Sequence, residues 1–482
     1  MGINIRDLVI VLPGIMGSVL ERENTEVWGL SGRAFSTYLF SGGKSISDLI
    51  LSADDDLDAD YAPDGVRATR LVSDLQILPG FWKVDGYDRL IRFLLENLNV
   101  ADGANLLQFP YDWRRDNRAS AKRLARLIDR ELHRWRRESG HSDAKVVLLA
   151  HSMGGLVARY YTEVLGGWLN CRALITFGTP FRGSVKALNY ILNGHTIGWT
   201  DVSPMLRSLP STYQLLPTYP CIEMGGGAVI RPTELGDGGQ LDLTRAKAGR
   251  AFHDEINAAL QSNVLRSDYQ SSYRLQPVIG IEQETLQSVR YSAGAFDPTE
   301  GLSTNIDTQL SYGDGTVPLA SAIPLELSGN WALPFYAETH ACIQNNVQVL
   351  DALREWLRQS QVKRLANLKG PSESAESPIT SPLPRPFIRL VVADQYSDNE
   401  SIDIVADVHA EAEPKSVTAI ISSNDAQEYP RQINLQRRDS RWQGRMPSSP
   451  PGRYRIKVRC DGPQDLMPPS VSDVFQVAPT GH

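Results

Sequence analysis

Short apolar segments alternate with amphipathic helical segments over residues 1–358, and this alternation limits the folds open to the chain. The run LVIVL at 8–12 ends at Pro13-Gly14, as a buried parallel strand does. Similar runs follow at 105–109, 145–150, 172–177, 277–281 and 332–336. Helical spacing of apolar residues is found at 86–98, 119–135 and 341–357. The alternation predicts an α/β domain with a mostly parallel sheet covered by helices on both faces.

The composition changes between residues 359 and 386. The segment GPSESAESPITSPLPRP within it is rich in proline and serine and has too few apolar residues to form a core, so 359–386 is predicted to be a linker. Beyond it, apolar and charged residues alternate, as in YRIKVRC at 454–460, which predicts strands with one solvent-facing side. About seven such segments predict an immunoglobulin-like β-sandwich over 387–482.

Charge and cysteine usage argue against several classes of protein. A net charge of −7 is unfavourable for a dedicated nucleic-acid-binding protein. The four cysteines are scattered without a Cys-X-X-Cys pair, so neither a disulfide framework nor a metal site is predicted, and no cofactor is expected. No apolar run approaches the ~18 residues of a membrane-spanning helix. Residues 1–6 lack the apolar core of a signal peptide, so a cytoplasmic protein is expected.

The strongest chemical signal is the segment AHSMGG at 150–155. It follows a predicted buried strand and precedes a helical stretch, which is the context of a nucleophile elbow. That sharp turn requires small residues two places before and after the serine, and here they are Ala150, in place of the more usual glycine, and Gly154. Ser152 is therefore the candidate nucleophile, and the alternative is a structural serine in a similar turn.

A nucleophilic serine needs a general base, and the base needs an acid that orients it. The chain order that accompanies such an elbow is serine, acid, histidine. Elimination by position leaves His340, which follows a predicted strand and precedes a helical segment. Asp314 is the best acid, because its flanking glycines permit a tight backbone, while Asp307 and Asp297 remain alternatives. His151 is predicted to pack with its side chain away from Ser152.

The oxyanion of an acyl transfer needs backbone N–H donors. One is the amide of Met153, directly after the serine at the start of the predicted helix. The segment PGIMGS at 13–18 follows the first strand, and its glycines let the backbone come close to a substrate. Either Ile15 or Met16 is therefore expected to supply the second donor, and the alternative is an ordinary glycine-rich turn.

Together these segments resemble the lecithin:cholesterol acyltransferase family of α/β-hydrolases, which includes phospholipid:diacylglycerol acyltransferases and lysosomal phospholipase A2. The resemblance covers about residues 5–358, and its motifs occur in the family's order with similar spacing. The matching segments are LPGIMGS (12–18), LPGFWKVDGY (78–87), FPYDWR (109–114), AHSMGG (150–155), FGTPFRGS (177–184), YGDGTVP (312–318) and ETHACI (338–343).

By position, the resemblance implies that Ser152 is the nucleophile, Asp314 the acid and His340 the base, with oxyanion donors at Ile15 and Met153. Candidate substrate-binding side chains within the matching segments are Met16 and Trp82. The resemblance also implies action on the ester bonds of membrane glycerolipids, with the acyl group passed to an alcohol or to water. The sequence has no recognisable motif for an acceptor alcohol, so water is the default acyl acceptor. The domain after residue 385 is not part of the family core.

Two segments bear on lipid contact. The insertion at about 183–247 contains scattered apolar residues, among them Trp199, Met205 and Leu206, and is predicted to form a cap. The apolar stretch 77–82 would dock on a membrane surface if exposed, but packing against the core is the more common use of such residues. The C-terminal domain is expected to dock on the catalytic domain, to tether it to a protein or carbohydrate, or to aid assembly.

The combined prediction is a serine-dependent lipid acyl hydrolase or acyltransferase, working through an acyl-Ser152 intermediate without metal or cofactor. Two alternatives stay open. One is an esterase or thioesterase for soluble substrates, and the other is a non-catalytic interaction protein built on a hydrolase scaffold.

Overall fold

A six-stranded sheet runs through the centre of the first domain in the order β19-β16-β11-β10-β2-β9, with every pair parallel. Its strands are β2 (Leu8–Leu12), β9 (Leu106–Gln108), β10 (Val146–His151), β11 (Cys171–Phe177), β16 (Arg274–Gly280) and β19 (Phe335–Tyr336). β2, β10 and β11 are buried at every residue, because helices cover both faces of the sheet. All six strands lie at the predicted segments, so the predicted α/β class is confirmed.

The chain is described here by a computed structural model. The residues it describes are 2–29, 44–51, 56–80, 82–197, 200–236, 239–270, 272–303, 306–328, 333–362, 386–423 and 430–480.

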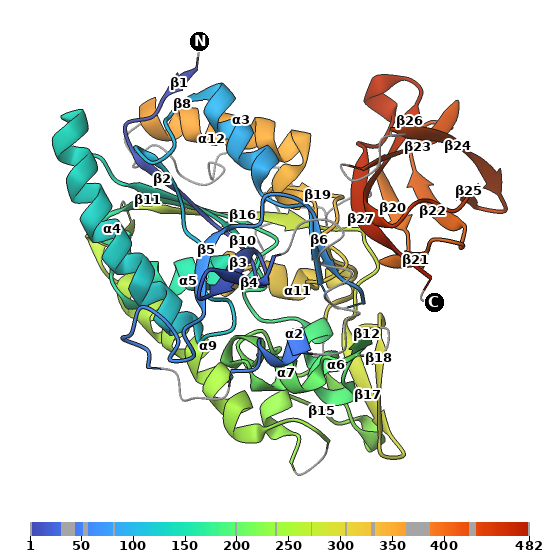
Figure 1. Cartoon of the computed structure of the whole chain (residues 1–482), viewed down its shortest axis with the longest axis horizontal. Helices are drawn as coiled ribbons and strands as arrows, with labels where there is room; N and C mark the ends of the chain where they lie inside the picture. Colours follow the sequence, from blue (N-terminus) through green and yellow to red (C-terminus); the bar gives the residue numbers. More distant parts are fainter. Residues whose placement is uncertain are drawn as a thin grey trace.

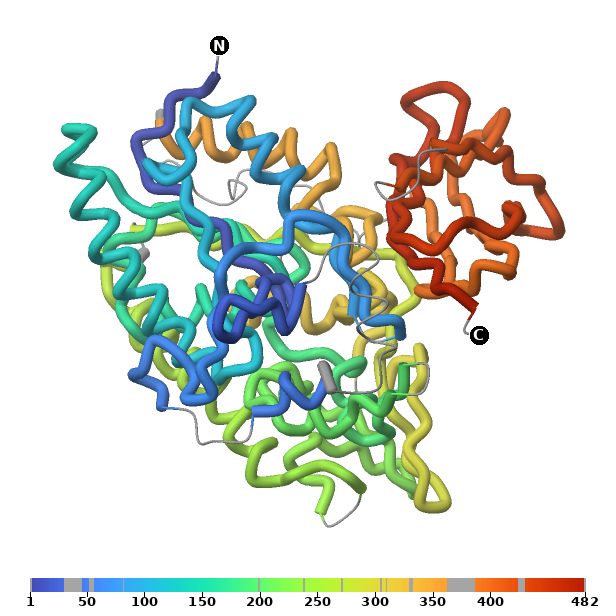
Figure 2. Tube along the Cα trace, viewed as in Figure 1, coloured from blue at the N-terminus to red at the C-terminus, as the bar shows by residue number. Residues whose placement is uncertain are grey.

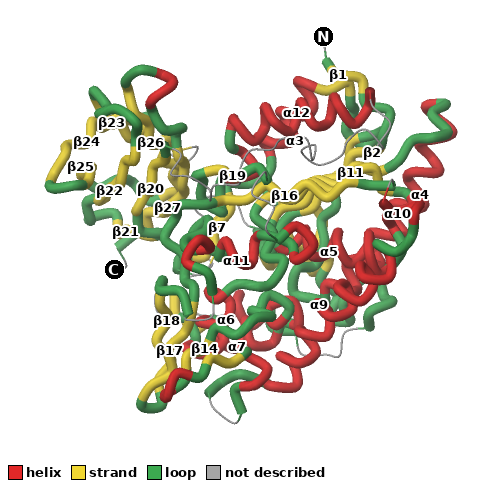
Figure 3. Tube along the Cα trace, turned by 180° about the vertical axis from the view of Figure 1, so that it is seen from behind, coloured by secondary structure: helices red, strands yellow, loops and turns green. Residues whose placement is uncertain are grey.

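Helices lie on both sides of the parallel sheet (Figures 1 and 3). One side has α3 (Asp88–Asn97) and α12 (Val347–Val362), and the other has α4 (Asn117–Ser139), α5 (Met153–Arg159) and α9 (Leu243–Asn263). α4 begins where the Asp116 side chain accepts a hydrogen bond from the Arg118 amide, and it ends at Gly140 in the left-handed region. α12 starts six residues later than predicted, because residues 343–345 first form a 3-10 turn, and it extends to Val362, past the predicted domain end at 358.

A cap covers one end of the α/β domain (Figure 1). It contains α6 (Val185–Asn193), α7 (Ser203–Ser208), α8 (Pro210–Tyr213) and a four-stranded sheet in the order β15-β14-β17-β18. That sheet joins β14 (Ile222–Glu223) and β15 (Val229–Ile230) to β17 (Ser288–Ser292) and β18 (Ala295–Thr299), so the cap uses residues on both sides of the predicted limit at 247. Met205 and Leu206 are buried, and Trp199 lies outside the described residues.

Several short strands were not predicted, because they lack a clear apolar pattern. They are β3 (Ser18–Arg22), β4 (Thr25–Trp28) and β5 (Arg67–Leu71) in one sheet, β6 (Gln76–Leu78) with β7 (Trp82–Val84), β1 (Ile3–Asn4) with β8 (Leu98–Asn99), and β12 (Thr196–Ile197) with β13 (Thr200–Asp201). In the β6–β7 hairpin, Ile77, Leu78 and Trp82 are buried, which favours core packing over membrane docking for that stretch. Among the helices of the described ranges, none has the length and apolar character needed to cross a membrane.

The C-terminal domain is a curled eight-stranded sheet in the order β20-β22-β25-β24-β23-β26-β27-β21. The strands are β20 (Phe387–Val391), β21 (Gln395–Ser397), β22 (Ile402–His409), β23 (Ser416–Ser423), β24 (Arg431–Arg438), β25 (Arg441–Met446), β26 (Gly452–Asp461) and β27 (Val471–Ala478). Along β26, Tyr454, Ile456 and Val458 point into the domain's own core, which confirms the β-sandwich class. The predicted linker lies mostly outside the described residues, at 363–385.

Candidate active site

Ser152 stands in a sharp turn between β10 and α5. Its backbone has φ 51° and ψ −125°, a region that non-glycine residues rarely occupy. The turn is held by its amide, which donates to the Phe177 carbonyl at 2.8 Å, and by its carbonyl, which accepts from Thr179 Oγ1 at 3.0 Å. A Cβ at Gly154 would lie 2.3 Å from the Pro13 carbonyl oxygen, so the predicted need for a small residue there is confirmed.

Ser152, His340 and Asp314 form one hydrogen-bonded chain. Ser152 Oγ lies 2.9 Å from His340 Nε2, and His340 Nδ1 lies 2.7 Å from Asp314 Oδ2. All three residues are buried. Because a carboxylate only accepts hydrogen bonds, Nδ1 carries the proton, and Nε2 of the neutral imidazole is left to accept from the serine hydroxyl. The tertiary structure therefore brings together the three side chains that the sequence singled out.

Asp314 is fixed by its own backbone surroundings. Its Oδ1 accepts from the amides of Thr316 at 3.0 Å and Val317 at 2.7 Å, which leaves Oδ2 for the imidazole. The His340 amide in turn donates to the Asp314 carbonyl at 2.8 Å. The two alternative acids, Asp297 and Asp307, are both exposed, so neither takes this position.

His151 links the loop after β2 to the loop that carries His340. The Gly14 amide donates to Tyr87 Oη at 2.8 Å, Tyr87 Oη lies 3.0 Å from His151 Nδ1, and His151 Nε2 lies 3.1 Å from the His340 carbonyl. Burial lowers the pKa of His151 to about 3, so its ring is neutral and donates from Nε2 to that carbonyl. The sequence predicted only packing for His151, since the chain gives no sign that Tyr87 lies beside it.

The segment 13–18 lies directly against the serine. A Cβ at Gly14 would come within 2.8 Å of Ser152 Cβ, so only glycine fits there. A turn follows, in which the Gly17 amide donates to the Gly14 carbonyl and Met16 has φ 59°. Within the described part of the chain, no hydrogen-bond acceptor is found for the amides of Ile15 or Met153. A role of these two amides as oxyanion donors stays a prediction.

The two candidate substrate-binding side chains are not on the surface. Met16 is completely buried, and its carbonyl accepts from Trp28 Nε1 at 2.9 Å. Trp82 is also buried, in β7, and belongs to the same apolar core cluster. A role for either side chain in substrate binding stays a prediction.

The family model for lecithin:cholesterol acyltransferases matches residues 62–263. Within the α/β domain, this matched segment is similar to the lecithin:cholesterol acyltransferase family. The resemblance seen in the sequence is thereby confirmed. The matched range contains Ser152 but ends before Asp314 and His340, so the placement of those two residues rests on the sequence motifs and on the geometry described above.

The solved structures found by comparison are very distant in sequence. Lipase BlEst2 of Bacillus licheniformis in propeptide form is 11% identical, over 97% of this chain and 93% of that one, with a TM-score of 0.33. Phospholipase PlaB from Legionella pneumophila is 11% identical, over 98% and 90%, with a TM-score of 0.24. The CARDB domain of a Pyrococcus furiosus protein is 12% identical, over 19% and 92%, with a TM-score of 0.15. A comparison with curated protein sequences finds no match.

The segment FPYDWR at 109–114 braces the loop beside the serine. Tyr111 Oη donates to the Pro13 carbonyl at 2.9 Å, and Trp113 Nε1 donates to the Ser18 carbonyl at 3.2 Å. Arg114 is fully buried and donates to both oxygens of Asp112, at 2.9 and 2.7 Å. These contacts indicate a structural role for Asp112 and Arg114, because a buried ion pair with several hydrogen bonds fixes the backbone around it.

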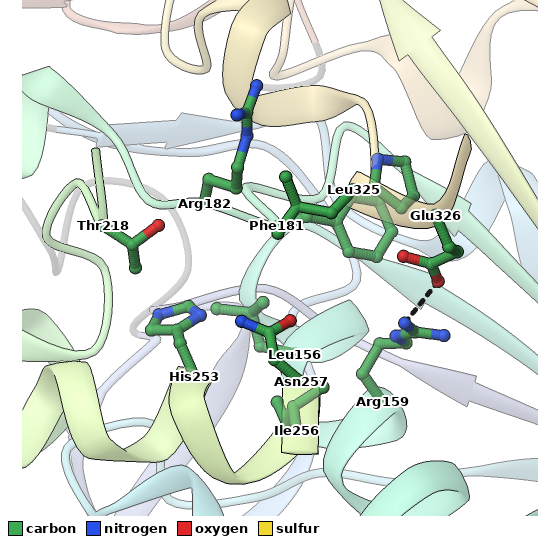
Figure 4. A pocket seen from close by; sticks show the side chains of 11 residues that line it. Leu156, Arg159, Phe181, Arg182, Thr218, His253, Ile256, Asn257, Leu325 and Glu326 are labelled. Carbon is green, nitrogen blue, oxygen red and sulfur yellow. Dashed lines mark hydrogen bonds and ion pairs between the residues drawn. The ribbon is translucent and has the colours of Figure 1, made fainter. Parts of the chain in front are cut away.

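A recess of about 30 Å³ lies beside α5 in the α/β domain, lined by Leu156 and His253 among others (Figure 4). The ion pair between Arg159 and Glu326 borders it, as Figure 4 shows. His253 Nε2 lies 2.7 Å from the Gln214 carbonyl, so this histidine is engaged away from Ser152. The recess has room for a water. No group of His, Cys, Asp and Glu in the described ranges is arranged to hold a metal.

Proposed function

We propose that this protein is a serine-dependent acyl hydrolase of lipid esters. The observation that carries the proposal is the buried chain from Ser152 through His340 to Asp314, with bonds of 2.9 and 2.7 Å. In the first step His340 Nε2 takes the hydroxyl proton while Ser152 Oγ attacks the ester carbonyl carbon. Asp314 keeps the proton on Nδ1 and stabilises the imidazolium that forms.

The tetrahedral oxyanion is placed against the amides of Ile15 and Met153. Each such donor contributes about 3–4 kcal/mol to lowering the barrier. His340 then protonates the leaving alcohol, the C–O bond breaks, and an acyl-Ser152 ester remains. Water, activated by the same imidazole, attacks this ester and releases the carboxylic acid. An alcohol in place of water would give acyl transfer instead.

The class of substrate is taken from the family. Members of the lecithin:cholesterol acyltransferase family act on glycerolipid esters, and this chain has the family's segments around Ser152. Nothing in the sequence indicates a site for an acceptor alcohol, so hydrolysis is proposed ahead of transfer.

A fluorophosphonate probe tests the nucleophile, because it reacts covalently with activated serines. Labelling is expected for the natural protein and is expected to be absent from Ser152→Ala. Ser120→Ala, which changes a buried serine in α4, is a matched control and should label normally. Labelling that persists in Ser152→Ala would move the nucleophile elsewhere.

Acyl-chain profiling tests the substrate class. The natural protein is offered phospholipid vesicles, soluble short-chain esters and acyl thioesters, with Ser152→Ala as the blank. Faster release of fatty acid from vesicles supports the proposal. A clear preference for soluble esters or thioesters would replace the lipid substrate by a soluble one, with the same Ser152 chemistry.

A further inference from the structure

The C-terminal β domain lies directly against the loops that carry His340 and Asp314. Its strand β27 runs beside the β6–β7 hairpin, and the close approach of the two traces can be followed in Figure 2. We propose that this domain is a positioning device for the reaction, in which Thr339 and Gln283 hold the base loop and the acid loop in register with Ser152. The inference rests on the proposed function, since it concerns the same serine chemistry.

The base loop is tied to β27 through a pair of hydrogen bonds around Ser472. Thr339 Oγ1 donates to the Ser472 carbonyl at 2.7 Å, and the Ser472 amide donates to Glu338 Oε1 at 2.8 Å. Glu338 Oε1 also accepts from the Thr339 amide at 3.0 Å, and Oε2 accepts from Asn346 Nδ2 at 2.8 Å. The residue directly before His340 is thus bonded to the other domain.

Apolar contact adds to these bonds. Val474 of β27 is fully buried and belongs to one cluster with four residues of the α/β domain, Leu75, Ile77, Ala341 and Cys342. Ala341 directly follows His340, and Thr339 directly precedes it. The C-terminal domain therefore packs with the chain on both sides of the base. Displacement of β27 would expose this cluster to water, which opposes any separation of the two domains.

The acid loop is tied to β20 in a similar way. The Gln283 side chain donates to the Ile388 carbonyl at 3.1 Å and accepts from the Leu390 amide at 3.2 Å, as a neighbouring strand would. The Gln283 amide donates to the Gly313 carbonyl at 2.9 Å, next to Asp314. Through its side chain and its backbone amide, the buried Gln283 therefore connects the C-terminal domain to the residue before the acid.

Buried charges fix where the domain sits. Lys83 Nζ lies 2.8 Å from Asp473 and 2.7 Å from Asp394, both in the C-terminal domain. Arg455 of β26 reaches back to Asp74, at 2.6 Å, and also pairs with Asp85. Ion pairs of this kind have strict geometry, and separating the charges costs interaction free energy. They therefore favour one orientation of the domain.

A cavity of about 350 Å³ lies next to the base loop, between Glu338 and Asp85 on one side and Ser472 and Lys457 on the other. Facing this cavity, the loop is held by the polar contacts of Glu338 and Thr339, in addition to the apolar cluster around Val474. Loss of the Thr339 hydroxyl is therefore expected to alter the position of His340.

The experiment uses the full chain and compares Thr339→Val, which keeps the shape but loses the O–H donor, with Thr339→Ser, which keeps the donor. kcat, KM and the rate of fluorophosphonate labelling are measured for each. We expect Thr339→Val to lower kcat and the labelling rate roughly 10- to 100-fold, the range seen when catalytic groups are displaced by up to an ångström. KM should stay close to that of the natural protein, and Thr339→Ser should recover most of the lost rate.

Two further variants complete the test. Gln283→Leu removes the tie to β20 and should also lower kcat more than it changes KM. Asp403→Asn breaks an exposed ion pair with Arg445 inside the C-terminal domain and should leave all three quantities unchanged. Normal kcat in both Thr339→Val and Gln283→Leu would overturn the inference, as would equal losses in Thr339→Val and Thr339→Ser.

Hydrogen exchange of the peptide containing residues 338–343 gives a readout independent of catalysis. Faster exchange in Thr339→Val than in the natural protein and Thr339→Ser supports the positioning role, and unchanged exchange overturns it. If the natural protein fails to label at Ser152, the proposed function fails, and the exchange result then shows separately whether the domain holds the loop.

Discussion

The two halves of the candidate site rest on different foundations. The serine and the loop at 13–18 follow β10 and β2, which are interior strands of the parallel sheet and buried at every residue. His340 follows β19, a two-residue strand at the edge of that sheet, and Asp314 lies in a long irregular connection. The nucleophile half is therefore held by the core, and the acid–base half by hydrogen bonds within its own loops together with contacts to the C-terminal domain.

Because of this difference, we expect the two halves to respond differently to substitutions and to pH. Around Ser152 the backbone is so closely packed that a single added methyl group has no room, so substitutions there act through steric conflict. Around His340 the determinants are hydrogen bonds and buried carboxyl groups, so substitutions and pH act through polar contacts. Changes in each half test whether the division holds.

The largest effect is expected in the acid–base half, from Asp314→Asn. An amide in place of Oδ2 favours the wrong tautomer of His340, and turnover should fall by about 10⁴. The measurement is kcat on the best ester substrate. The control is Asp307→Asn, which changes an exposed alternative acid and should be close to normal. The reverse result would transfer the acid role to Asp307.

In the nucleophile half, Gly14→Ala should lower kcat by roughly 10²–10³, the loss that accompanies removal of an oxyanion donor. The new Cβ would lie 2.8 Å from Ser152 Cβ and would push the loop away from the serine. Gly225→Ala is the matched control, because a Cβ there meets nothing within 4 Å. A Gly14→Ala enzyme with normal kcat would show that this half tolerates movement.

The buried carboxyl of Glu338, in the acid–base half, predicts that the stability of the folded protein depends on pH. Burial raises the pKa of its carboxyl from 4.5 to about 7, with a contribution from Asp473, although three donors act in the opposite direction. The folded protein therefore holds this proton more tightly than the unfolded chain does. Its contribution to stability is complete below about pH 4.5 and is lost as the pH rises to about 7, a change of roughly 3 kcal/mol.

Thermal unfolding at about pH 5 and about pH 8 measures this contribution. The natural protein should lose more stability across the interval than Glu338→Gln, whose amide does not titrate. Equal losses in the two proteins would mean that this carboxyl is already ionised at the lower pH.

The smallest effect is expected at the bridge between the halves. Tyr87→Phe removes the hydroxyl that accepts from Gly14 and donates to His151, which leaves two buried polar groups unpaired. We expect a loss of about 1–3 kcal/mol in the free energy of unfolding, measured by denaturant titration. Tyr61→Phe changes an exposed tyrosine and is the control. An unchanged stability in Tyr87→Phe would show that the halves are joined by other contacts.

Much of the fold could be predicted from the sequence, because buried parallel strands are short apolar runs and the apolar residues of amphipathic helices have a regular spacing. The elements that escaped prediction, such as the β6–β7 hairpin and α9, have weak periodicity and owe their form to neighbours distant in the chain. Ser152 could be predicted from local sterics alone. Asp314 and His340 followed from chain order and flanking glycines.

The sequence by itself determined the strands of the central sheet, the tight turn at Ser152 and the choice of Ser152, Asp314 and His340 as candidates, since these follow from local residue patterns and chain order. Only the tertiary structure decided that His151 bridges Tyr87 to the His340 carbonyl, and that Thr339 meets Ser472 across 133 positions of the chain. Contacts of that kind leave no local pattern, because they depend on how the completed domains come together rather than on the conformational preferences of any one segment.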